Sequence, residues 1–122
     1  MVTTVTSLGR SGLSDWILQR ISALVMTSYL VFILGYLYGN PEVNYSQWVS
    51  LHSSLPMRIF SLATILSIAA HGWIGMWCVL TDYVTVRLLG PKATVIRMFL
   101  QLVMIAITLL YVIWAIDILW GI

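Results

Sequence analysis

Residues 59–81 read IFSLATILSIAAHGWIGMWCVLT and contain no Asp, Glu, Lys or Arg. This run of 23 residues is long enough to cross a bilayer as a helix, because about 20 apolar residues span the hydrocarbon core. His71 stands near its middle, roughly 15 Å from the helix end. An ionisable side chain at such a depth is energetically costly and is a functional candidate by default.

Small residues share the helix face that carries His71. Ala63, Ser67 and Gly75 recur with it at intervals of four residues. Such a face allows another helix to approach closely, or leaves a slot beside the imidazole for a flat macrocycle. A histidine here can simply hydrogen-bond to a neighbouring helix, but neutral imidazole is also a good metal ligand. The small-residue face favours the ligand hypothesis for His71.

The composition indicates a membrane protein. Of 122 residues, 61% are hydrophobic and 8% are charged, and the mean hydropathy is +0.98. A water-soluble domain of this size needs a charged exterior. Residues 21–38 and 98–116 form two further uncharged runs, and neither shows the alternation of barrel strands. We therefore predict an all-α membrane protein, one domain over residues 1–122, with three transmembrane helices near 16–38, 58–81 and 97–119.

The basic residues are distributed unevenly around these runs. Arg58 precedes the second run, whereas the other five lie before the first run or between the second and third: Arg10, Arg20, Arg87, Lys92 and Arg97. Basic residues accumulate on the cytoplasmic side of a membrane. A cytoplasmic N-terminus and an external C-terminus, periplasmic in a Gram-negative bacterium, are predicted. The formal net charge of +2 is too small to indicate nucleic-acid binding.

Residues between and within the runs give smaller expectations. Residues 45–49 are expected to form a short interfacial helix, and Gly90-Pro91 is a turn signal. His52 lies in the loop before Pro56 and is expected to face water. Gln101 is expected to form a hydrogen bond between helices.

The second run ends in Thr81-Asp82-Tyr83. Tyr83 lies 12 residues beyond His71, or roughly 18 Å along the helix. A tyrosine at this place is usually part of an interfacial aromatic belt, but its hydroxyl can also donate a hydrogen bond to a quinone carbonyl. Asp82 can orient a neighbouring arginine or simply be solvated. Arg20, expected at the same membrane level, can snorkel, bind haem propionates or polarise a quinone site.

The segment from His71 to Tyr83, HGWIGMWCVLTDY, closely resembles the characteristic motif of the small hydrophobic membrane anchor of bacterial succinate dehydrogenase (complex II). The opening residues 7–16, SLGRSGLSDW, the following Arg20, the chain length and the three uncharged runs also fit that family. The resemblance covers nearly the whole chain.

The resemblance implies a membrane anchor in the bacterial cytoplasmic (inner) membrane rather than a complete enzyme. Its implied partners are a second membrane anchor, an iron–sulfur protein that carries the clusters and a flavoprotein that carries the FAD. Succinate oxidation then occurs in the flavoprotein, and electrons pass through the clusters to ubiquinone. The three helices are expected to complete a haem-binding bundle with the second anchor.

The resemblance also assigns residues. His71 aligns with the axial ligand that this type of anchor gives to the iron of haem b. If that haem has two axial imidazoles, the other must come from another chain. Tyr83 aligns with the tyrosine that hydrogen-bonds ubiquinone, with Asp82 beside it. Arg20 is placed near the haem propionates or the quinone. Ser14 stands where some relatives carry a histidine, so no role is carried over to it, and residues 84–97 are longer and more basic than in close relatives.

Two alternatives remain open at this point. A fumarate reductase anchor, which uses a low-potential quinone, would need similar parts. The second alternative is a small membrane subunit without a redox role, such as part of a transporter or an assembly factor. Transporters typically show broken helices or paired charges within the membrane, and the sequence shows neither.

Overall fold

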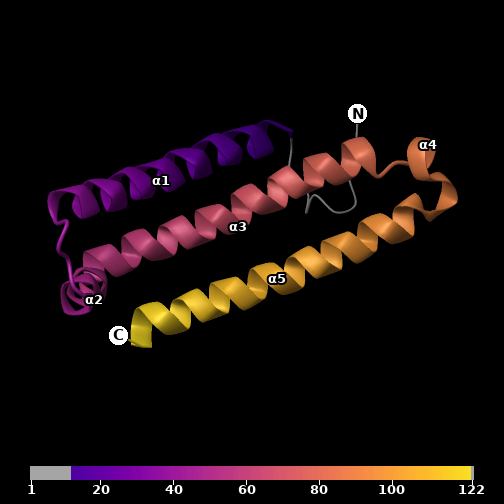
Figure 1. Ribbon diagram of the computed structural model, residues 1–122. Coiled ribbons are helices and arrows are strands. Elements are labelled where there is room, and N and C mark those ends of the chain that lie inside the picture. The colour runs from indigo at the N-terminus through magenta and orange to yellow at the C-terminus, as the bar shows by residue number, and fades with distance from the viewer. Residues whose placement is uncertain (1–11, 122) are drawn as a thin grey trace.

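The computed structural model describes residues 12–121, which form helices joined by short connections (Figure 1). The long helices are α1 (Gly12–Gly39), α3 (Leu55–Tyr83) and α5 (Ala93–Gly121), and the short ones are α2 (Tyr45–Ser53), α4 (Val86–Leu89) and the 3₁₀ turn η1 (Gly90–Lys92). Each long helix contains one uncharged run and extends beyond it at both ends. By length and composition all three can cross a membrane. The predicted all-α membrane fold is confirmed.

Helix α3 lies between the other two long helices, which run antiparallel to it (Figure 1). Both α1 and α5 pack along α3, but they scarcely contact each other. The three helices therefore form an open layer instead of a closed bundle. Only 6% of the most apolar window of α1 is buried, against 17% for α3. Most apolar side chains are consequently left to lipid or to another protein.

Polar and aromatic contacts join α1 to α3. The hydroxyls of Tyr29 and Ser61 are hydrogen-bonded at 2.8 Å. The ring of Phe60 packs edge-on against Tyr29, with 5.0 Å between ring centroids. Lipid chains are as apolar as leucine, so burial of apolar surface drives helix association weakly in a membrane. Specific contacts of this kind therefore set the register of the two helices.

Helix α5 contacts α3 through a small residue and a charged one. A Cβ added at Gly72 would lie 3.4 Å from Met104 Cε, so the glycine permits close packing. Near the other end, Arg58 Nε donates to the Leu119 carbonyl at 3.0 Å. The last carbonyls of a helix lack partners within the helix and carry partial negative charge. Arg58 therefore stabilises the C-terminal end of α5 while joining it to α3.

The predicted helix at residues 45–49 is confirmed and continues to Ser53 as α2. A capping box begins it, because Gln47 N donates to the Asn44 side chain while Asn44 N donates to the Gln47 side chain. The longer helix corrects the prediction for His52, which is 9% exposed instead of facing water. Its Nδ1–H donates to the Trp48 carbonyl at 2.9 Å. Helix α2 also packs against α3, which removes this side chain from solvent.

The turn predicted at Gly90-Pro91 is confirmed. Gly90 has φ of 73°, a conformation that L side chains rarely adopt. Pro91 lies in the 3₁₀ turn that leads directly into α5. The chain can therefore reverse between α3 and α5 within a short connection, and its basic residues stay at the membrane end where α1 begins.

The antiparallel layer yields a topology prediction. Lys92 lies at the end of the molecule where α1 begins, whereas Asn44 and the C-terminal end of α5 lie at the opposite end. We expect reporter fusions at Lys92 to give a cytoplasmic signal, and fusions at Asn44 and Ile122 to give a periplasmic one. A cytoplasmic signal at Ile122 would contradict this orientation.

Candidate functional site

His71 lies in the middle of α3, and its half-buried imidazole faces α1. Ser22 Oγ is 3.1 Å from His71 Nδ1, and Gln19 Nε2 is 3.4 Å from His71 Nε2. Ser22 is 2% exposed and is the one buried residue of α1. The most buried position of this apolar helix is thus a polar side chain bonded to His71.

The hydrogen bonds around His71 identify the nitrogen that carries the proton. Ser22 Oγ donates its single hydrogen to the Gln19 backbone carbonyl at 2.9 Å. It must therefore accept from His71, which places the proton on Nδ1. The Gln19 amide nitrogen can only donate, so it requires an unprotonated Nε2. Both contacts favour the same neutral tautomer, in which Nε2 is unprotonated and accepts from the Gln19 amide.

The contact at Nε2 is the weaker of the two contacts to the ring. The Gln19 contact is long at 3.4 Å, and the Gln19 side-chain oxygen is buried without a hydrogen-bond partner in residues 12–121. The amide is therefore weakly held. A Cβ built at Gly75 would lie 3.9 Å from the Gln19 amide nitrogen, so this flexible group occupies the space beside Gly75. A ligand at Nε2 would have to displace this amide.

Tyr83 and Asp82 are the last two residues of α3, and both are exposed. The Tyr83 side chain is 67% exposed. Both backbone polar groups of Val84, the next residue, are hydrogen-bonded. Its N–H donates to the Leu80 carbonyl, and its carbonyl accepts from Arg97 Nη2 at 3.2 Å. Helix α5 therefore holds the turn that follows Tyr83.

The structure corrects the expected level of Arg20. Its neighbour Gln19 contacts His71, so the Arg20 backbone lies close to the level of the His71 imidazole. That level is about ten residues, or roughly 15 Å along the helix axis, from the level of Tyr83. The guanidinium carbon lies 5.1 Å from the centre of the Trp16 ring, one turn nearer the start of α1. The reason is the register of α1 on α3, which the contacts of Gln19 and Ser22 with His71 fix.

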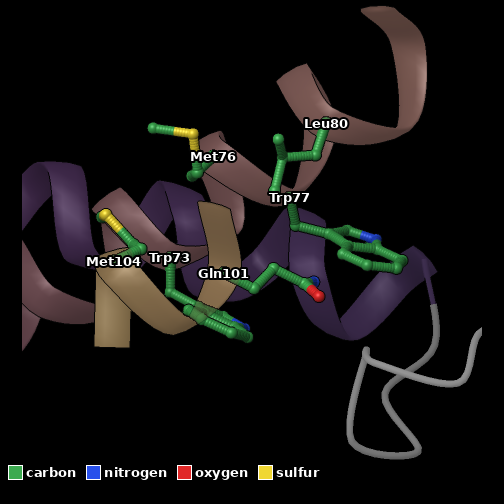
Figure 2. Close-up of a pocket in the computed structure, with 6 residues that line it drawn as sticks. All are labelled: Trp73, Met76, Trp77, Leu80, Gln101 and Met104. Atoms are coloured by element: carbon green, nitrogen blue, oxygen red, sulfur yellow. The ribbon is translucent and has the colours of Figure 1, made fainter. Parts of the chain in front are cut away.

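Gln101 lies in a narrow gap between α3 and α5. Figure 2 shows its side chain reaching from α5 toward the indoles of Trp73 and Trp77. Its amide nitrogen and the Trp73 indole nitrogen are buried and have no hydrogen-bond partner in the described part of the chain. The predicted interhelical hydrogen bond from this amide is therefore absent there. The gap is too narrow to admit a water molecule.

Together, the fold and the site define a membrane protein with three candidate spanning helices, an unprotonated Nε2 on the histidine of the central helix, and an Asp-Tyr pair where that helix ends. No protein-family model matches the sequence. The chain is 41% identical over 111 residues to the succinate dehydrogenase hydrophobic membrane anchor subunit of Coxiella burnetii, and the match covers 91% of this chain and 90% of that protein. The chain belongs to the family of succinate dehydrogenase hydrophobic membrane anchor subunits. The resemblance inferred from the sequence is confirmed.

Three residues that sequence reasoning did not single out contribute to the site: Gln19, Ser22 and Arg97. Gln19 and Ser22 are three residues apart, so they share one face of α1 where the chain enters its apolar run. Two polar residues at that spacing in a membrane helix predict that this face contacts another helix. The role of Arg97 depends on the path of the turn after Tyr83, which has no comparable sequence signal.

The Arg97 contact predicts the dynamics of this turn. Arg97→Ala removes the donor to the Val84 carbonyl, so the amides of residues 84–90 should exchange hydrogen for deuterium faster. Arg87→Ala is the matched control, because Arg87 is exposed on α4 within the same connection. Hydrogen–deuterium exchange with mass spectrometry measures the difference. Equal exchange in the two variants would show that Arg97 does not hold the turn.

Proposed function

We propose that this chain anchors a succinate:ubiquinone oxidoreductase in the bacterial inner membrane. It pairs with a second membrane anchor, and the two hold the iron–sulfur protein and the flavoprotein on the cytoplasmic face. The FAD and the iron–sulfur clusters belong to those partners. This chain contributes His71 to a haem b shared between the anchors and Tyr83 to the site of ubiquinone reduction.

The observation that carries the haem proposal is the unprotonated Nε2 of His71. When bound, haem b supplies a one-electron redox centre. His71 Nε2 would hold the iron, while its Nδ1–H would keep its hydrogen bond to Ser22. The chain has one other histidine, His52, which lies in α2 at the opposite end of the layer. A second axial imidazole must therefore come from another chain.

The open layer supports the pairing with a second anchor. Helices α1 and α5 cover two sides of α3. They scarcely contact each other, so they do not close around α3, and its remaining faces stay uncovered along most of its length. Haem needs protein on both of its faces to be held away from lipid. Helices of the second anchor packed on this layer would complete the pocket, as the sequence also predicts.

The level of Arg20 favours a role toward the haem over a role toward the quinone. Its backbone lies near that of His71, and its guanidinium extends toward Trp16 and the cytoplasmic end of α1. Haem propionates are anions, and a guanidinium binds carboxylates with two parallel hydrogen bonds. We therefore assign Arg20 to a propionate.

Tyr83 is positioned to act on ubiquinone. Its exposed side chain lies at the end of α3, in the expected contact zone with the iron–sulfur protein. Reduction of the quinone builds negative charge on its carbonyl oxygens, and a donated hydrogen bond stabilises that charge. Asp82 is exposed beside it and is assigned to the electrostatic environment of the quinone.

His71→Ala tests the haem proposal. The complex purified in mild detergent should contain the partner proteins and show a haem spectrum. In the variant this spectrum should be lost or changed, because one axial ligand is gone, and the complex should be less stable. His52→Ala is the control and should keep the spectrum. An unchanged low-spin spectrum in His71→Ala would exclude this residue as the ligand.

Tyr83→Phe tests the quinone proposal. The ring remains and the donor is lost, so succinate–quinone activity should fall by roughly a hundredfold, while succinate oxidation with an artificial dye acceptor stays near normal. Tyr38→Phe, an exposed tyrosine at the opposite end of the layer, should retain full quinone activity. Full quinone activity in an assembled Tyr83→Phe complex would place Tyr83 in the aromatic belt alone.

A further inference from the structure

We propose that Ser22 is a positioning residue for the iron ligand: its hydroxyl accepts the Nδ1–H of His71, fixes the tautomer and presents Nε2 to the haem iron. This inference rests on the proposed role of His71. It concerns a residue of α1, a different helix from the one that carries the ligand.

The burial of Ser22 supports this role. Among the residues of α1, only Ser22 is buried, and it is 2% exposed. A serine placed there for packing alone would need only its bond to the Gln19 carbonyl. The oxygen instead also lies 3.1 Å from Nδ1, so both its donor and its acceptor capacity are used. A hydroxyl with this geometry specifies the orientation of the imidazole as well as the tautomer.

The hydrogen bond has a chemical consequence for the ligand. Histidines that bind metals usually donate their other ring N–H to a protein acceptor, which fixes the ring and raises its basicity. A more basic imidazole donates more electron density to ferric than to ferrous iron. Hydrogen bonding around the ligands is also one of the means by which a protein sets a haem potential. Loss of the Ser22 acceptor should therefore raise the midpoint potential of the haem.

The Gln19 contact has a different meaning. It occupies Nε2, the same atom that the iron would take, and it is the longer of the two bonds to the ring. Gln19 would therefore have to leave Nε2 for this nitrogen to hold the iron. The Ser22 bond is made to the opposite nitrogen and is compatible with ligation.

The test uses the assembled complex with four substitutions. Ser22→Thr keeps the hydroxyl, and Ser22→Val has nearly the shape of threonine without it. Ser22→Ala removes the hydroxyl and leaves space. Ser28→Ala is the control, because Ser28 is exposed on α1 and its hydroxyl donates only to the Leu24 carbonyl. Haem content, the low-spin ferric electron paramagnetic resonance signal and the haem midpoint potential are measured for each.

We expect Ser28→Ala and Ser22→Thr to match the wild type. Ser22→Ala and Ser22→Val should show a raised potential, a shifted resonance signal and roughly 10- to 100-fold weaker haem retention. Unchanged potential and signal in Ser22→Ala or Ser22→Val would overturn the proposal. Equal loss in the threonine and valine variants would also overturn it, because size alone would then explain the serine. Absence of haem from the wild type, or an unchanged low-spin spectrum in His71→Ala, would instead refute the proposed function.

Discussion

In a bilayer, a polar side chain has no water to bond with, so its partner must be part of the protein. This constraint decides how the helices of this layer meet. The Nδ1–H of His71 finds its acceptor in the hydroxyl of Ser22. The hydroxyls of Tyr29 and Ser61 meet the same need for a partner nearer the opposite end of the layer. Apolar side chains have a similar free energy against lipid and against protein, so they do not select one register over another. A few polar contacts therefore determine the register of α1 on α3.

The same physical reason explains why the layer is open. Soluble helices of this composition would collapse to bury their apolar faces, whereas lipid solvates those faces here. Helix α3 takes the central position, with α1 and α5 both packed against it. The arrangement leaves apolar faces for the second anchor in the proposed complex. In the proposed complex, this one arrangement would serve both the anchoring of the partner proteins and the shared haem site.

The positions of individual side chains were less predictable. His52 is buried because α2 is longer than the loop pattern indicated and places it one turn after Trp48. Arg20 lies near the depth of His71 because of the register of α1 on α3. The expectation for His52 assumed a loop where α2 continues, and the expectation for Arg20 assumed that the end of the uncharged run marks the level of Tyr83. Charge marks where a run ends, but backbone hydrogen bonding determines where a helix ends.

The sequence by itself determined the helical class, the three spans, the charge asymmetry and the motif from His71 to Tyr83 that indicated the family. These properties depend on length and on local periodicity, which a linear chain carries completely. Only the tertiary structure placed Ser22 against Nδ1, Gln19 against Nε2 and Arg97 against the turn after Tyr83. Those contacts join residues 49, 52 and 13 positions apart. They depend on the rotation and axial offset of one helix against another, and an apolar run does not encode either quantity, because many offsets bury similar apolar area.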